Sequence, residues 1–264
     1  MPSIAELRAV GQPKEHLERP GEEHWAGRLY MRRLSPYLTR VLLATPLSAN
    51  GVTALMIPVG LLAALTLTLP GLWAAVGAAL LIQLQLLLDC CDGEVARWRR
   101  TFSPKGPYLD ALAHYSTEAA LPAALGVRAD GGWDSIGGWT ALGLTVSVLV
   151  LLLKSETHLV AVMRAKAALT PRVEPAASST SPSGRRLRFR EGVRLVPFLR
   201  PFQAVEASLL ALAAAVVDAA GDDLTGSRAL LVALVAAAAI AVVGHLLAIL
   251  ASDRLSGPDG GASD

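Results

Sequence analysis

Apolar residues fill this chain in long blocks, and charged residues interrupt the blocks at only a few places. No charged residue occurs between Arg40 and Asp89. That length exceeds the roughly 20 residues that one membrane-spanning helix needs, and it is enough for two such helices divided at Pro70-Gly71. The whole pattern predicts an all-α fold, an integral membrane bundle of six transmembrane helices. The expected spans are 50–69, 72–97, 108–127, 136–163, 201–217 and 229–252.

The residues before the first span have a different pattern. Residues 1–24 are polar and mixed in charge, which predicts a loosely ordered arm. From Trp25 to Arg40, aromatic residues and leucines alternate with arginines, which is typical of an amphipathic helix lying at the membrane interface. We expect a break near Pro36, and an ordinary surface helix is the alternative. The predicted organisation is a cytoplasmic arm and interfacial helix (1–49), the six-span domain (50–252) and a cytoplasmic tail (253–264).

Composition agrees with a membrane protein, since 53% of residues are hydrophobic and only 17% are charged, against roughly 25% charged in soluble domains. Lysine and arginine concentrate in the N-terminal arm, the 97–105 turn and the 164–200 loop, whereas the opposite loops are acidic. The positive-inside rule therefore predicts that both termini face the cytoplasm, as in a multi-pass protein of the cell (plasma) membrane. The basic cluster at 185–190 has two interpretations, attraction to anionic lipid or a topology signal alone. Nothing else in the sequence supports nucleic-acid binding.

The second predicted span ends in an unusual polar face. Helical spacing puts Asp89, Asp92, Gly93, Ala96 and Arg97 on one stripe, where an amphipathic helix normally has apolar residues. After the turn, Gly106, Asp110 and His114 recur every fourth residue on one face of the next helix. Ionisable groups at membrane depth are functional candidates, because their insertion is costly without a partner. Three neighbouring aspartates predict a divalent cation such as Mg²⁺, Mn²⁺ or Ca²⁺, and Mg²⁺ would commonly complete its shell with a phosphorylated ligand.

These residues resemble the signature of the CDP-alcohol phosphotransferases, D-x2-D-G-x2-A-R-x8-G-x3-D-x3-D. Seven of its eight fixed positions are kept: Asp89, Asp92, Gly93, Ala96, Arg97, Gly106 and Asp110. The segment Thr45-Pro46-Leu-Ser-Ala-Asn50-Gly-Val-Thr53 is similar to the family's T-P-N-x-x-T segment before its first span. The resemblance implies six spans, a cytosol-facing site and a homodimer.

The resemblance also implies a reaction. An alcohol hydroxyl attacks the β-phosphorus of a CDP-linked donor, usually CDP-diacylglycerol, and CMP leaves. The family's metal and diphosphate ligands correspond here to Asp89, Asp92 and Asp110. Its nucleotide pocket corresponds to Asp92, Gly93, Ala96, Arg97, Gly106 and Asp110. The acceptor is a small alcohol or alcohol phosphate whose identity the motif does not specify.

His114 stands where the family has a fourth aspartate, which serves as general base and metal ligand. Imidazole is a competent base near neutral pH, but it is a poorer Mg²⁺ ligand than a carboxylate. Three interpretations follow: His114 is the catalytic base and a weak metal ligand, the site binds a CDP-lipid but catalyses poorly, or metal preference shifts toward Mn²⁺ or Zn²⁺. The alternative to an enzyme is thus a membrane protein that retains a CDP-lipid pocket.

Other polar residues are weaker candidates. Glu118, Glu156 and His158 are possible acceptor contacts. Two of them also have a structural interpretation: a carboxyl held neutral by a hydrogen bond within the bundle for Glu118, and a Lys154–Glu156 pair in the fourth span for Glu156. His245 is expected to be a packing or interfacial residue. Glu94 lies off the acidic stripe, so we expect it to be solvated or paired with an arginine.

Overall fold

A computed structural model of the chain describes residues 1–13, 24–167, 200–252 and 255, and this part is helical with no β-strand. Its elements are α1 (Ile4–Gly11), the π-helical turn η1 (Gly27–Met31), α3 (Arg32–Leu43), α4 (Ala49–Leu67), α5 (Leu72–Arg99), α6 (Lys105–Asp130), the short turn η2 (Trp133–Ser135), α7 (Gly138–Lys166), the short turn η3 (Arg200–Phe202), α9 (Ala204–Gly221) and α10 (Thr225–Leu250). The basic cluster at 185–190 lies outside the described residues.

Five of the described helices, α4, α5, α7, α9 and α10, are long and apolar enough to cross a membrane. The prediction of an all-α multi-pass membrane protein is thereby confirmed. The predicted third span corresponds to α6, which is less apolar because it bears part of the polar face. Its 26 residues give a length of about 39 Å, enough to cross a hydrocarbon core of about 30 Å. Six crossings stay a prediction.

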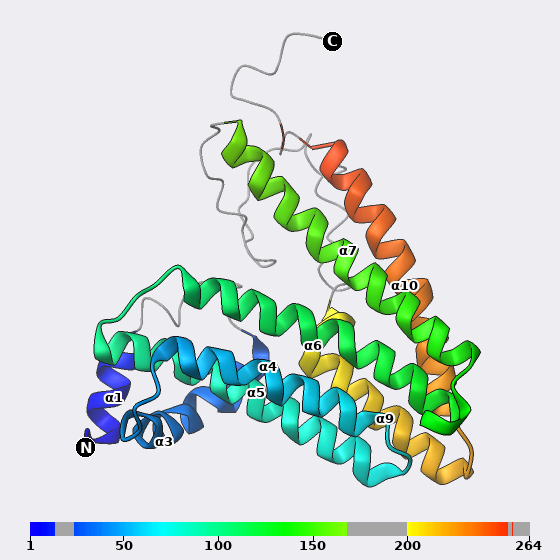
Figure 1. The fold of residues 1–264 in the computed structure, drawn as a ribbon, viewed down its shortest axis with the longest axis horizontal. Helices are drawn as coiled ribbons and strands as arrows, with labels where there is room; N and C mark the ends of the chain where they lie inside the picture. The colour runs from blue at the N-terminus through cyan, green and yellow to red at the C-terminus, as the bar shows by residue number, and fades with distance from the viewer. Residues whose placement is uncertain (14–23, 168–199, 253–254, 256–264) are drawn as a thin grey trace, which may run out of the picture.

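The long helices form two groups (Figure 1). Helices α4, α5, α6 and α9 run along one another, whereas α7 and α10 lie side by side and lean away from α6. Many large apolar side chains on these helices are exposed, including Leu65, Leu80, Val148 and Ile240. Exposed apolar surface of this kind is what a lipid-facing helix presents.

Residues 4–11 form helix α1 and not the loosely ordered arm that the sequence predicts. Ser3 and Glu6 form a capping box, in which the Ser3 side chain accepts from the Glu6 N–H and the Glu6 carboxylate accepts from the Ser3 N–H. Leu7 and Gly11 are buried against the rest of the molecule. The expectation is therefore wrong for residues 4–11, because they form a capped helix whose Leu7 and Gly11 pack against the rest of the molecule. Residues 14–23 lie outside the described part.

Helix α3 is continuous through Pro36, so the predicted break there is wrong. Proline has no N–H to donate to the carbonyl four residues earlier, which belongs to Arg32. That carbonyl instead accepts from Gln12 Nε2 at 2.7 Å. The face of α3 toward the protein is polar, with Ser35 and Thr39 fully buried. Its opposite face exposes Leu34, Tyr37 and Val41, which suits the predicted position at the membrane interface.

A buried polar contact fixes the register of α4, α5 and α6. Gln85 Nε2 donates to Met56 O at 3.1 Å and to Thr117 Oγ1 at 2.8 Å. Gln85 lies one turn before Asp89 on α5, and Thr117 lies about one turn after His114 on α6. At Gly60 of α4 a Cβ atom would lie only 1.9 Å from Thr117 Oγ1. The three helices can approach this closely only because residue 60 has no side chain.

Candidate active site

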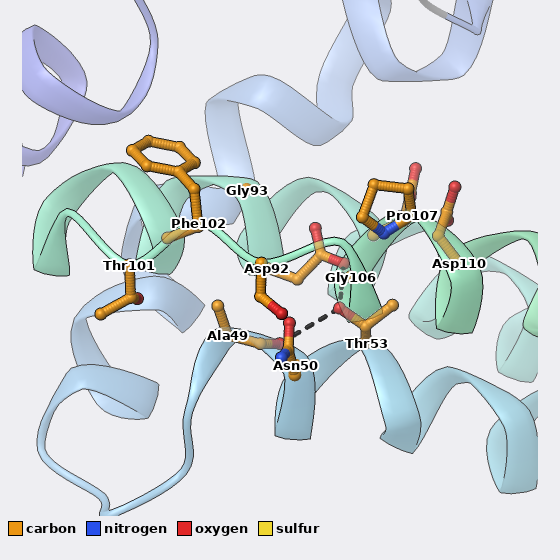
Figure 2. Close-up of a pocket in the computed structure, with 13 residues that line it drawn as sticks. Ala49, Asn50, Thr53, Asp92, Gly93, Thr101, Phe102, Gly106, Pro107 and Asp110 are labelled. Carbon is orange, nitrogen blue, oxygen red and sulfur yellow. Dashed lines mark hydrogen bonds between the residues drawn. The ribbon is translucent and has the colours of Figure 1, made fainter.

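A pocket opens where the first turns of α4 meet the end of α5 and the start of α6 (Figure 2). It is lined by Ala49, Asn50, Thr53, Asp89, Asp92, Gly93, Ala96, Thr101, Phe102, Ser103, Gly106, Pro107 and Asp110. Six of these thirteen residues belong to the predicted polar faces of α5 and α6. The two faces therefore meet, as the motif predicts.

The chain reaches this arrangement through a tight connection between α5 and α6. Helix α5 ends at Arg99 and is capped by Arg100, whose φ of 54° is left-handed and whose N–H bonds back to the last turn. Only residues 100–104 separate the two helices. The short loop turns the chain sharply, so that residues 89–96 and 106–114 face each other.

Asp89, Asp110 and His114 form a cluster of possible metal ligands. One ligand atom from each lies within 4.8 Å of the others, and this is the one such group among the described residues. His114 Nε2 is 3.3 Å from Asp110 Oδ1 and 3.9 Å from Asp89 Oδ1. Asp110 Oδ1 is buried and accepts no hydrogen bond from the described groups. Two carboxylates and an imidazole whose ligand atoms face one another fit a divalent cation.

Asp92 lines the same pocket but is not part of that cluster. Its Oδ2 accepts a hydrogen bond from Thr53 Oγ1 at 2.6 Å, and Figure 2 shows the two side chains facing each other between α5 and α4. Thr53 is buried, with 2% of its surface exposed. The hydroxyl orients the carboxylate and stabilises it by a hydrogen bond within the bundle.

Asn50 and Thr53 were not predicted as site residues. Ser48 caps α4, with its hydroxyl accepting from the Gly51 N–H, and this start places Ala49, Asn50 and Thr53 on the turn that faces the pocket. The sequence feature that could have indicated them is that both are polar, at the start of an otherwise apolar span. That feature does not show which residues of α5 and α6 they contact.

The motif glycines allow close approaches. A Cβ at Gly106 would lie 3.3 Å from Asn50 Oδ1, so the start of α6 sits directly against α4. A Cβ at Gly93 would lie 3.0 Å from both terminal nitrogens of Arg97. Arg97 itself does not line the pocket, and its Nε donates to Gly11 O at 2.7 Å. Arg99 also binds backbone, donating to the carbonyls of Leu47 and Thr45 before α4.

The three possible acceptor residues lie outside the pocket lining, between α6, α7 and α10. Glu118 pairs with Lys154 at 2.6 Å, and His158 contacts the Tyr115 hydroxyl. Glu156 pairs with His245 at 2.9 Å. The Lys154–Glu156 pair is therefore wrong, because residues two apart on a helix face different neighbours. His245 packs between helices, as expected, and also binds Glu156.

Glu94 is neither solvated nor exposed, since only 1% of its surface is accessible. Its carboxylate accepts hydrogen bonds from Gln12, Ser35 and Thr39. The expected arginine is also present, with Arg32 Nη1 at 3.8 Å from Glu94 Oε1. The expectation of a solvated side chain fails because α1 and α3 cover this face of α5.

Comparison with known proteins agrees with the geometry. No curated protein matches the chain. The family model described as CDP-alcohol phosphatidyltransferase matches residues 46–183, a range that contains α4, α5, α6, α7 and every pocket residue. With just over half of its length matched, and with the motif residues gathered in one pocket, the chain belongs to the CDP-alcohol phosphatidyltransferase family.

Proposed function

We propose that this protein transfers a phosphatidyl or related group from CDP-diacylglycerol to an alcohol acceptor and releases CMP. Its family implies phosphatidyl transfer from a CDP-alcohol in phospholipid synthesis. The observation that carries the proposal is the convergence of Asp89, Asp110 and His114 within 4.8 Å, in a pocket whose walls are the small motif residues Gly93, Ala96 and Gly106.

Asp89, Asp110 and His114 would hold a divalent cation, Mg²⁺ or Mn²⁺, with Asp92 beside them. The convergence of these three side chains is the observation in favour of this assignment. A cation bound there neutralises the charge of a diphosphate and polarises its phosphorus–oxygen bonds. Asp92, fixed by Thr53, supplies a further carboxylate oxygen at the pocket wall.

The nucleotide end of the donor would lie against Asp92, Gly93, Ala96 and Gly106, with Arg97 behind that wall. The small residues Gly93, Ala96 and Gly106 let a flat group approach the backbone of both helices. The pocket also contains the first turn of α6, through Gly106 and Pro107.

In the reaction, the acceptor hydroxyl oxygen forms a bond to the β-phosphorus. The bond from that phosphorus to the bridging oxygen breaks, and CMP leaves with the electron pair. In this step His114 is free of the cation: its Nε2 takes the hydroxyl proton, and the Asp110 carboxylate at 3.3 Å stabilises the resulting imidazolium. Holding the reactants in line and compensating charge contribute most of the rate in phosphoryl transfer.

The acceptor would approach from the α7 side, where Glu118, Glu156 and His158 offer polar contacts. Lys154 and Tyr115 join these residues, so the wall presents both donors and acceptors. This mixture suits a small alcohol or alcohol phosphate. We further propose a plasma-membrane location with the site and both termini on the cytoplasmic face, and a homodimer.

The test incubates the purified protein with labelled CDP-diacylglycerol, Mg²⁺ or Mn²⁺, and pooled alcohols, and then identifies CMP and the lipid product. We expect CMP release that requires both the acceptor and the cation, and that Asp89→Asn abolishes. Binding of CDP-diacylglycerol without CMP release under any condition would instead support the non-enzymatic alternative, a membrane protein that retains the pocket.

A further inference from the structure

Helix α1 ends directly on the motif helix. Gly11, its last residue, is buried, and a Cβ at this position would lie 3.2 Å from Glu94 Cγ and 3.3 Å from Glu94 Cβ. Leu7, one turn earlier, is 1% exposed. The backbone of α1 therefore touches α5 within the motif itself, at residue 94, between Gly93 and Arg97.

The contact controls the direction of the Arg97 side chain. Arg97 Nε donates to Gly11 O at 2.7 Å. A carbonyl at the end of a helix has no partner in its own helix and lies at the negative end of the helix dipole, so it suits a cationic donor. The terminal nitrogens of Arg97 then lie beside Gly93, whose other side lines the pocket.

A second set of bonds holds α1 in this place. Gln12 Nε2 donates to Glu94 Oε1 at 2.8 Å and to Arg32 O at 2.7 Å. Ser35 and Thr39 donate to the same carboxylate at 2.5 and 2.6 Å. The residue after Gly11 is thus tied to α3 and α5 together, which leaves Gly11 O little freedom to move.

We propose that α1 is a positioning element of the nucleotide pocket, which acts through Gly11 O to hold the Arg97 guanidinium against Gly93. The inference rests on the proposed function. A cation fixed behind the pocket wall attracts an anionic donor without occupying the space the donor needs. A free arginine at this position would instead be drawn toward the pocket carboxylates or into water.

A double-mutant cycle tests this role, with Gly11→Val, Arg97→Ala and their combination. The readouts are calorimetric binding of CDP in Mg²⁺, and KM against kcat for CDP-diacylglycerol. Because a hydrogen bond to a charged group contributes about 1.5–3 kcal/mol, each single change should weaken CDP binding about tenfold or more. We expect KM to rise more than kcat falls. We also expect the double variant to bind CDP as tightly as Arg97→Ala alone does.

Ala9→Val is the matched control, since Ala9 is exposed on the same helix. This variant should bind CDP as the unaltered protein does. Gly11→Ala, which adds only the Cβ, replaces Gly11→Val should the latter fail to fold. Additive losses in the double variant, or unchanged CDP affinity in both Gly11 variants, would overturn the inference alone. Failure of the unaltered protein to bind CDP would overturn the proposed function with it.

Discussion

The Thr53 hydroxyl is the residue-scale feature that decides where Asp92 points. Thr53→Val keeps the shape of the side chain but removes the 2.6 Å bond to Asp92 Oδ2. Changes to groups that orient metal ligands typically lower metal affinity or activity 10- to 100-fold. We expect a loss of about tenfold in transfer rate and in apparent Mg²⁺ affinity, measured by titrating Mg²⁺ in the CMP-release assay.

Thr66→Val is the control for that change. Thr66 lies on the same helix and donates to Leu62 O, as Thr53 also donates to Ala49 O, each four residues earlier. Thr66 lies far along α4 from the pocket. Equal losses in the two variants would show that a general effect on α4, and not the orientation of Asp92, explains the result.

His114 is the residue that departs from the family motif. His114→Ala removes both the proposed base and a possible metal ligand, so we expect transfer to fall by about 10²-fold or more. His114→Asp restores the family residue and should retain or raise activity. Steady-state CMP release checks both. Near-normal turnover in His114→Ala would end the base assignment, and a folded but inactive His114→Asp would show that histidine itself is required.

At the scale of elements, the close contact among α4, α5 and α6 at Gly60 sets the distance between these helices where they line the pocket. In Gly60→Ala the new methyl group would collide with Thr117 Oγ1 and with Gln85 Nε2, at 1.9 and 2.6 Å. Overpacking of this kind typically costs about 1–3 kcal/mol. We expect a lower Tm in detergent and reduced transfer, because α6 must shift relative to α5.

Gly77→Ala is the matched control on α5. Its Cβ would meet Thr66 Cγ2 at 3.4 Å, an ordinary contact, and alanine favours the helix over glycine. Its Tm should stay equal or rise. A Gly60→Ala variant as stable and active as Gly77→Ala would show that the helices at residue 60 move apart at little cost.

Helix-scale features were the most predictable part of the molecule, because helical periodicity is local. The spacing from Asp89 to Arg97 and from Gly106 to His114 was enough to assign each polar face. The partners of these faces were harder to predict, since they come from distant parts of the chain. Thr53 lies 39 residues before Asp92, and His245 lies 89 residues after Glu156. Side chains so far apart in sequence meet through tertiary packing, which one sequence does not encode visibly.

Two errors have the same physical origin. The polarity of residues 1–24 as a whole hid a capped helix at its start, because α1 buries only Leu7 and Gly11, and the following Gln12 reaches α3 and α5. Pro36 indicated a break because proline leaves a helix carbonyl without its donor, and only the folded structure supplies Gln12 as the replacement. In both cases tertiary contacts overrode a sound local expectation.

For the whole molecule, the main prediction is that α6 crosses the membrane. Thr101 precedes α6 and Ser135 follows it, and both are exposed. We expect Thr101→Cys to react with an impermeant maleimide only after cells are permeabilised, and Ser135→Cys to react in intact cells. The native Cys90 and Cys91 are 4% and 0% exposed, so they should give little background. Labelling of both new cysteines from the same side would mean that α6 does not cross.

The burial of Glu94 has a consequence for the order of biosynthesis. Among the described residues, the side chains shown in contact with its carboxylate, Gln12, Arg32, Ser35 and Thr39, all precede it in the chain. Because a chain is synthesised from its N-terminus onward, these four residues have already left the ribosome when Glu94 does. The carboxylate therefore meets a ready-made set of partners, and at no stage need it wait unpaired for a later segment.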